Sequence, residues 1–244
     1  MPTDWKSTLP LQALILAAVS GGSDSVAMTL RLLDEAGKRG WQIHVVHINH
    51  HLSGEASDED AAFVEQFAAD RNLPFTLLHI RDEDLRASGE EVSSSLEARL
   101  REERYRLLVE TARHVGAAAI ALGHTATDLA ETFMIMALRG SGPGGLGSMR
   151  AVRASSDPSI VFIRPLLDET REGIQAWLRE RGVSWRSDPM NDTTAVRRNK
   201  LRHRVFPELE KIEPAAVEVF ARSAELCAEA QDLTGTLMVA RSER

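Results

Sequence analysis

The segment Val19-Ser20-Gly21-Gly22-Ser23-Asp24-Ser25 follows an apolar run, Leu14-Ile15-Leu16-Ala17-Ala18, and precedes a helix-like stretch, 26–33. This order predicts a buried strand, a turn of small residues and the start of a helix. Paired glycines let a ligand approach the main chain closely, and the free N–H groups of a helix start favour a phosphate. Because the carboxylate of Asp24 would repel a bare phosphate, we expect a divalent cation between the two.

An ordinary turn with a capped helix is the alternative interpretation of this segment. The segment contains more than a helix cap needs. It has two adjacent glycines, Gly21 and Gly22, and three residues with side-chain oxygens, Ser23, Asp24 and Ser25. We therefore favour a phosphate site. It differs from the usual nucleotide loop, because the sequence has no Gly-x-x-x-x-Gly-Lys-Ser/Thr pattern.

The composition is that of a soluble globular protein. The 244 residues are long enough for one sizeable α/β domain with a smaller appendage, and 43% of them are hydrophobic and 27% charged. No apolar run approaches the roughly 20 residues that span a membrane, and the start does not resemble a signal peptide. The single cysteine, Cys227, excludes a disulfide framework and a cysteine-based metal cluster. We expect a cytoplasmic protein, without a membrane partner, whose net charge of −7 still allows local basic patches.

Two further turns follow predicted strands, at the edge where ligands bind in open α/β sheets. The strand 43–48 ends in Asn49-His50-His51, and its alternation puts His44 and His47 on opposite faces, which disfavours a structural metal site. The strand 117–122 leads into 123–128 and a helix start. There Asp128 and Glu131 lie three residues apart and would share a face suited to an ammonium group. In the alternative, Thr127 is the helix N-cap and the two acids only complement the helix dipole.

Two basic segments are candidate phosphate-binding patches. Arg101 and Arg104 lie one turn apart on a predicted helix, 93–115, and could instead form a solvated face paired with nearby glutamates. The run 197–204 has six residues of eight that can carry positive charge and no acid. This run predicts local phosphate binding, with a plain basic helix end as the alternative.

The whole pattern predicts an open, mainly parallel, doubly wound α/β sheet with helices on both faces and a short helical C-terminal extension. We divide the chain into a catalytic domain, 1–209, and a helical extension, 210–244. The extension contains an amphipathic pattern over 213–239, with Val217, Phe220, Ala224 and Leu226 on its apolar face. The segment 139–149 is too rich in glycine for a packed element and is expected to be a linker or a ligand-approaching loop. The remaining expected elements are helices over 57–71 and 170–181 and strands over 75–80 and 160–163.

Between Leu14 and about Leu209, these stretches resemble the tRNA(Ile)-lysidine synthetase family of the N-type ATP pyrophosphatases. Besides the pattern Ser-Gly-Gly-x-Asp-Ser, four sets of residues carry the resemblance. They are His47-Ile48-Asn49-His50; Gly123-His124 with Asp128, Glu131 and Thr132; Arg139-Gly140-Ser141-Gly142 with Gly145-Leu146; and Arg164-Pro165-Leu166-Leu167 with Arg198-Asn199, Leu201 and Arg202.

The resemblance implies an enzyme that binds ATP and Mg²⁺ and adenylates O2 of the wobble cytidine in an isoleucine tRNA with a CAU anticodon. Free lysine then attacks C2 and expels AMP, which leaves lysidine. The implied ATP-binding residues are Ser20, Gly21, Gly22, Ser23, Asp24, Ser25, His47, Ile48, Arg101, Arg104 and Gly123. Asp24 would also bind the metal; Asp128, Glu131 and Arg198 would bind lysine; Arg139 and Arg202 would bind tRNA. The catalytic set would be Asp24, Asp128, Glu131 and Arg198, and the oligomeric state stays open, a homodimer included.

The sequence departs from the family pattern at several positions. Thr127 stands where the first of two adjacent aspartates is usual, Ser53 replaces a frequent arginine, and Met190 replaces a common serine. The chain also ends at Arg244, short of the C-terminal tRNA-binding domains of many members. A tRNA thiolase shares the phosphate segment, but it would need catalytic or cluster cysteines, and Cys227 is the single cysteine and lies far from that segment. A glutamine-dependent amidotransferase also shares it, but no glutaminase-like nucleophilic cysteine is present and a partner chain would be needed. A non-catalytic nucleotide- or RNA-binding relative is the remaining alternative.

Overall fold

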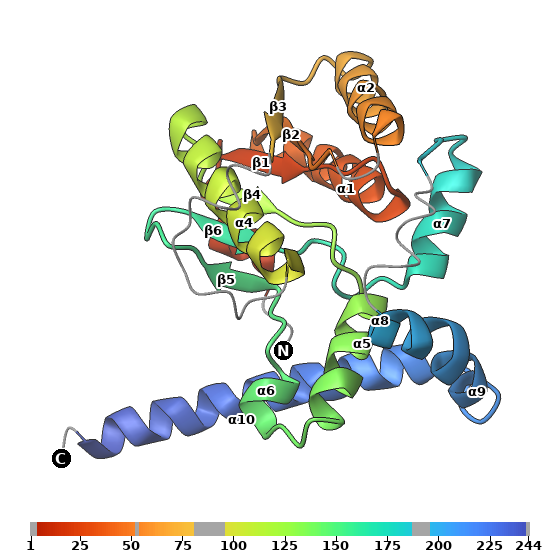
Figure 1. The fold of residues 1–244 in the computed structure, drawn as a ribbon. Helices are drawn as coiled ribbons and strands as arrows, with labels where there is room; N and C mark the ends of the chain where they lie inside the picture. Colours follow the sequence, from red (N-terminus) through yellow and green to blue (C-terminus); the bar gives the residue numbers. More distant parts are fainter. Residues whose placement is uncertain (1–3, 52–53, 81–95, 187–195, 243–244) are drawn as a thin grey trace.

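A sheet of six strands in the order β3-β2-β1-β4-β6-β5 forms the centre of the molecule (Figure 1). The computed structural model describes residues 4–51, 54–80, 96–186 and 196–242. Neighbouring strands pair in parallel except at one edge, where β5 runs antiparallel to β6. This sheet confirms the predicted fold class. The strands are β1 (Leu14–Ala18), β2 (Gln42–Asn49), β3 (Phe75–His79), β4 (Ala119–Ala121), β5 (Val152–Ala154) and β6 (Val161–Ile163).

Helices cover both faces of the sheet because the strands are apolar on both sides. In β1, Ile15 and Ala17 belong to the apolar cluster that includes α1, α2 and α7, whereas Leu16 belongs to the cluster that includes α4. Figure 1 shows α4 and α1 on opposite sides of the sheet. The helices are α1 (Ser23–Arg39), α2 (Glu55–Ala69), α4 (Leu96–Val115) and α7 (Arg171–Glu180). The residues 93–95 of the helix predicted over 93–115 lie outside the described ranges.

A second group of helices lies beside the sheet, with the long α10 running along α5 and α6 (Figure 1). Ala221 and Ala224 of α10 form an apolar cluster with Ala126 and Leu129 of α5. The first turns of α5 are therefore held between α10 and the sheet. This group contains α5 (Ala126–Ala137), α6 (Pro143–Leu146), α8 (Val196–Lys200), a π-helical turn (Leu201–Val205), α9 (Phe206–Glu210) and α10 (Ala216–Ser242); a 3₁₀ turn, η1 (Trp5–Thr8), lies near the N-terminus.

The structure corrects two expectations about packing. The glycine-rich segment contains a packed element, α6, and a Cβ at Gly147 would lie 2.4 Å from the backbone nitrogen of Ala228 in α10. Glycine serves there to let two backbones approach each other. Leu226 is 56% exposed instead of lying on the apolar face, because α10 packs through Val217, Ala221 and Ala224.

Within the described ranges, the structure contains no helix that is both long and apolar enough to cross a membrane. The division of the chain at residue 209 stays a prediction.

Candidate functional site

The segment 20–25 connects β1 to α1 at the carboxyl end of the strand. Gly21 has φ +94°, a left-handed conformation that favours glycine. The N-cap of α1 is Gly22, and no described side chain caps the helix, so the alternative of an ordinary capped turn is wrong. The hydroxyl of Ser25 instead donates to the Gly22 carbonyl at 3.0 Å and accepts from the Ser20 amide at 3.2 Å. The side chains thus fix the shape of the turn, and the N–H groups of the first helical turn are left without a side-chain cap.

The turn after β4 packs directly against this segment. A Cβ at Gly123 would lie 3.1 Å from both Cα and N of Ser25, so glycine is needed for the close approach. The predicted meeting of two ligand-facing turns at one edge of the sheet is therefore confirmed. It brings the start of α5, with Asp128, next to Asp24.

Arg171 links these two turns. Its Nε and Nη2 donate to Oδ2 of Asp24 at 3.0 and 2.8 Å, and its Nη2 lies 3.4 Å from Oδ1 of Asp128. Sequence reasoning missed Arg171, which is the first residue of α7. The evidence in the sequence for a residue such as Arg171 is only indirect. Two carboxylates expected at one edge of the sheet would need a positive charge between them, but nothing identified the residue that supplies it.

Asp128 is also part of a helix cap. Its Oδ2 accepts from the backbone amide of Thr125 at 3.0 Å, and its own amide donates to Oγ1 of Thr125, so Thr125 is the N-cap. The alternative that Thr127 caps the helix is wrong, because Oγ1 of Thr127 accepts from the backbone amide of Arg171 at 3.1 Å. Burial alone would raise the pKa of Asp128, but the charge of Arg171 and the hydrogen bonds from Thr125 outweigh it and lower that pKa. Asp128 is therefore a stable anion.

Glu131 is fully buried and faces a second arginine. Nε and Nη2 of Arg202 donate to its two carboxylate oxygens at 2.8 and 3.1 Å, and Arg202 also lies 3.8 Å from Asp128. The predicted common face of Asp128 and Glu131 is thus confirmed. Burial raises the pKa of Glu131 against the opposing effect of Arg202. The tRNA contact expected for Arg202 stays a prediction, but the guanidinium is already engaged inside the protein.

Arg198 reaches the same side of α5, where its Nη2 donates to Oγ1 of Thr132 at 3.3 Å. Arg139 lies elsewhere, at the other end of α5. It lines an apolar groove of about 360 Å³, together with Ile135, Leu138, Lys200, Leu201 and Val205. The structure therefore gathers Asp24, Asp128, Glu131, Arg198 and Arg202 at one site and leaves Arg139 apart from them.

Two histidines at the carboxyl edge of the sheet have fixed and opposite tautomers. Nδ1 of His47 lies 2.8 Å from the carbonyl of Val19 and must donate to it, so a neutral His47 has an accepting Nε2. Nδ1 of His124 accepts from Nε of Arg164 at 3.1 Å, so its proton is on Nε2. Burial lowers the pKa of His47, and burial followed by Arg164 lowers the pKa of His124 to about 3. Near neutral pH, Nε2 of His47 is therefore a hydrogen-bond acceptor, whereas Nε2 of His124 is a donor.

Arg101 and Arg104 lie on α4 beside Tyr105, on the sheet face opposite α1. Their guanidinium carbons lie 5.4 and 5.9 Å from the centroid of the Tyr105 ring. Ile48 packs on the same face of the sheet, and Ser53 and Met190 lie outside the described residues. The nucleotide contacts expected for Arg101, Arg104 and Ile48 stay predictions.

A family model described as a PP-loop domain matches residues 6–209. Curated relatives named tRNA(Ile)-lysidine synthase include one from Geobacter sulfurreducens, 39% identical over 224 residues that make up 92% of this chain and 46% of the relative. A relative of the same name from Thermus thermophilus is 44% identical over 90% of this chain and 40% of its own length. The chain thus spans less than half the length of these relatives.

Solved structures with the same architecture include the U34-tRNA thiolase NcsA from Methanococcus maripaludis, with its [4Fe-4S] cluster. It has a TM-score of 0.74 and 18% identity, over 91% of this chain and 74% of that chain. The NH3-dependent NAD synthetase from Campylobacter jejuni has a TM-score of 0.50 and 18% identity, over 91% of this chain and 87% of that chain. At these identities the likeness supports the fold alone.

Proposed function

The chain belongs to the PP-loop domain family, and from this premise we propose that it uses ATP to join lysine to a cytidine of an isoleucine tRNA. The relatives named tRNA(Ile)-lysidine synthase confirm the resemblance that the motifs predicted. One observation carries the proposal: the carboxylate of the phosphate segment, Asp24, shares Arg171 with Asp128 of the acidic pair on α5. Groups suited to phosphate and groups suited to an amine therefore belong to one site.

In the first step, O2 of the cytidine attacks the α-phosphorus of ATP. The bond from O2 to phosphorus forms, and the bond to pyrophosphate breaks. The main-chain N–H groups and hydroxyls of Ser20 to Ser25 would bind the departing pyrophosphate. The Nε2–H of His124, beside the first turns of α5, would donate to an oxygen on which negative charge develops.

In the second step, the side-chain amine of lysine attacks C2, the bond from C2 to O2 breaks, and AMP leaves. Asp128 and Glu131 would bind the ammonium group before it loses a proton, and Arg198 would bind the lysine carboxylate. Of the two acids, Glu131 is the better proton acceptor, since burial raises its pKa while Arg171 and Thr125 hold that of Asp128 low. Arg202 would fix the direction in which Glu131 points.

The residues present fit a magnesium ion. Asp24 and Asp128 lie close enough to share the cation of Arg171, so the same two carboxylates could share a divalent ion in its place. Within the described residues, no group of three or more acids, histidines and cysteines could hold a metal. Mg²⁺ typically takes one or two carboxylates, which Asp24 and Asp128 could supply, and completes its shell with phosphate oxygens and water. When bound, the ion would neutralise charge on the phosphates of ATP.

We also propose that residues 1–209 carry the chemistry and that 210–244 support it, because α10 packs against the catalytic helix α5. The thiolase alternative is not favoured, since the chain has one cysteine and the solved thiolase is named with an iron–sulfur cluster.

Pyrophosphate release from ATP, measured with tRNA and each amino acid in turn, tests the proposal. We expect release to require tRNA and, under turnover, to be stimulated by lysine and by none of the other amino acids. Release that is indifferent to lysine, or absent with every amino acid, would contradict it.

A further inference from the structure

Four arginines gather on the α4 face of the sheet, and we call them the arginine cluster: Arg101 and Arg104 on α4, Arg153 on β5, and Arg164 just after β6. Three of them surround one aromatic ring, with the guanidinium carbons of Arg101, Arg104 and Arg153 lying 5.4, 5.9 and 5.0 Å from the ring centroid of Tyr105. The fourth, Arg164, is only 4% exposed. The cluster therefore places four positive charges close together, and part of it is buried from solvent.

Within the described part of the chain, no carboxylate pairs with any member of the cluster. Arg164 donates to His124 and to the backbone carbonyl of Arg150, both of which are neutral acceptors. Burial lowers the pKa of Arg104 and of Arg164, and neighbouring arginines lower both further. Like charges that lie close together without counterions destabilise a fold. A bound anion would reduce this repulsion, so we expect the cluster to bind one.

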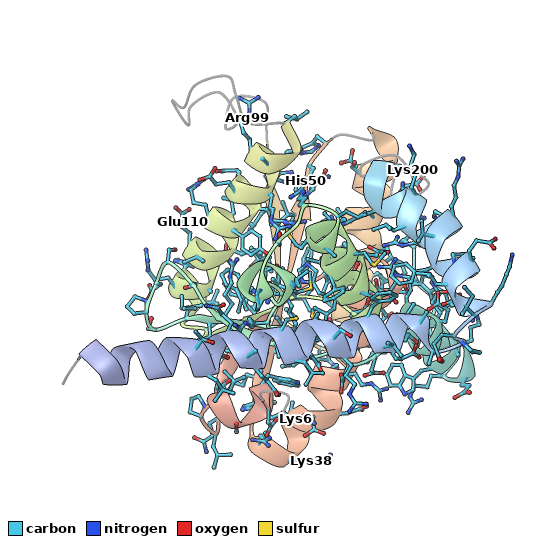
Figure 2. All side chains as sticks on the ribbon, turned by 90° about the horizontal axis from the view of Figure 1, so that it is seen from below. Lys6, Lys38, His50, Arg99, Glu110 and Lys200 are labelled. Carbon is cyan, nitrogen blue, oxygen red and sulfur yellow. The ribbon has the colours of Figure 1, made fainter. Side chains whose placement is uncertain are left out.

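Other arginines on the same helix are paired with acids. Arg106 donates to Glu103 and Glu110, and Nε of Arg113 donates to Asp157 at 2.8 Å. Figure 2 shows Glu110 pointing outward from α4. Among the side chains that the structure describes, two acids of α4 therefore pair with Arg106, and none pairs with Arg101 or Arg104.

One ring nitrogen of a histidine beside the cluster also has no hydrogen-bond partner among the described residues. This atom is Nδ1 of His50, and it is buried. Burial and then Arg104 lower the pKa of His50 to about 4, which places the ring close to the cluster and keeps it neutral. Figure 2 shows His50 on the inner side of α4, away from Glu110. A ligand at the cluster would meet this unused nitrogen as well as the guanidinium groups.

The shape of the cluster indicates an extended anion. Arg164 lies next to His124 at the carboxyl edge of the sheet, whereas Arg153 is exposed on β5, the outermost strand. Three strand spacings separate β5 from β1, which leads into the phosphate segment, and they amount to about 14 Å. Arg153 also packs on Phe162, on the sheet face away from α1. An ATP held by residues 20–25 would have its phosphates three strands away from β5, whereas a chain of phosphates could contact the cluster from Arg164 to Arg153.

We propose that the arginine cluster binds the phosphate backbone of the RNA substrate, on the α4 face of the sheet and outward to β5. Guanidinium forks match phosphate geometry, and Tyr105 holds three of them in place through its ring face. The inference rests on the proposed function for the nature of the substrate. It adds Arg153 and Arg164 as RNA contacts and assigns Arg101 and Arg104 to RNA instead of ATP.

Binding of an isoleucine tRNA with a CAU anticodon, measured by fluorescence anisotropy over a range of salt concentrations, tests the inference. The variants are Arg153→Gln and Arg101→Gln, with Arg113→Gln as the matched control, an acid-paired arginine of α4. We expect each cluster variant to weaken tRNA binding roughly tenfold at low salt and to reduce the salt slope by about 0.7 for each lost phosphate contact. Arg113→Gln should bind as the unaltered protein does, and ATP affinity, measured separately, should be unchanged in Arg153→Gln.

Three results would overturn the inference: unchanged tRNA binding in Arg153→Gln, a loss of ATP binding alone in the cluster variants, or an equal loss in Arg113→Gln. Thermal unfolding of each variant separates a lost contact from a lost fold, and Arg153→Lys, which retains the charge, should keep most of the affinity. Lysidine formation is followed in parallel. If the unaltered protein forms lysidine but Arg153→Gln binds tRNA normally, only the RNA-binding role of the arginine cluster is refuted. If Arg153→Gln weakens tRNA binding but the unaltered protein forms no lysidine, only the proposed function is refuted.

Discussion

Arg171 donates two hydrogen bonds to a single carboxylate oxygen of Asp24, at 2.8 and 3.0 Å, although the two residues lie 147 positions apart in the sequence. The same guanidinium approaches Asp128 at 3.4 Å. This bridge joins the phosphate segment, the acidic helix α5 and the start of α7. The bridge also marks the position where a divalent cation would have to compete with an arginine.

Replacement of Arg171 by Gln should make the protein more sensitive to magnesium. Loss of the guanidinium leaves Asp24 and Asp128 as neighbouring anions, and we expect the free energy of unfolding to fall by about 1–3 kcal/mol. Added Mg²⁺ should recover more of this stability in the variant than in the unaltered protein, since the arginine no longer competes. Urea unfolding with and without Mg²⁺ measures both effects.

Arg31→Gln is the matched control, because Arg31 of α1 pairs with Glu169 at 2.7 Å, just before α7. That pair is about one-third exposed and its loss should cost less than about 1 kcal/mol. An equal response of the two variants to Mg²⁺ would contradict a cation site between Asp24 and Asp128.

His124 should make the stability of the protein depend on pH below 6.5. Its pKa in the folded state is about 3, well below the usual value of 6.5, so the unfolded chain takes up a proton that the folded protein excludes. Stability is therefore complete above pH 6.5 and declines as the pH falls toward about 3, by up to roughly 1.4 kcal/mol per pH unit for one group. His124→Asn should flatten this decline in urea unfolding measured between pH 4.5 and 7. Parallel pH profiles of the two proteins would show that His124 is not held neutral.

Glu131 and Arg202 should act as one unit in the use of lysine. Glu131→Gln removes the charge that would bind the ammonium group, and Arg202→Gln releases the carboxylate from its fixed direction. We expect both variants to raise the lysine concentration needed for half-maximal rate by roughly 10- to 100-fold, while formation of the adenylated tRNA persists. Asp24→Asn should instead abolish pyrophosphate release.

The outcome for Arg202→Gln separates its two assigned roles. A rise in the tRNA concentration needed for half-maximal rate, without a change for lysine, would favour the tRNA contact that the family resemblance implied. Equal loss of both chemical steps in Glu131→Gln would contradict the division of roles between Glu131 and Asp24.

Replacement of Gly147 by Ala should destabilise the protein at the contact between α6 and α10. A Cβ there would lie 2.4 Å from the nitrogen and 2.6 Å from Cα of Ala228, so Gly147→Ala forces the backbones apart and should cost about 1–3 kcal/mol. Gly142→Ala is the control, since a Cβ at Gly142 would meet no described atom within 4 Å. Thermal unfolding compares the two variants. A Gly147→Ala protein as stable as Gly142→Ala would show that α6 is not packed against α10.

Local patterns predicted the parts of the fold that local forces determine. The strand Leu14–Ala18 and the helix start at Ser23 follow from an apolar run beside paired glycines, and the caps of α7 at Thr170 and Arg181 match the predicted ends of the helix. The shared face of Asp128 and Glu131 follows from helical spacing alone.

Contacts between distant segments could not be predicted in this way. Arg171 meets Asp24 only because α7 starts beside the turn after β1, and Arg202 meets Glu131 only because the turn after α8 packs on α5. The strand β5 lies at the sheet edge and is mostly exposed, so it lacks the apolar run that marks the equally short strands β4 and β6. The fold of α6 depends on α10, whose Ala228 leaves room only for glycine.

We propose that the phosphate segment and the acidic face of α5 form one site that joins lysine to a cytidine. The most direct test is the mass of the wobble nucleoside, released from an isoleucine tRNA with a CAU anticodon after incubation with the protein, ATP, Mg²⁺ and lysine. We expect a cytidine that has gained one lysine with loss of water, formed only when ATP and lysine are both present. An unmodified cytidine, in reactions where ATP has been split to AMP and pyrophosphate, would contradict it.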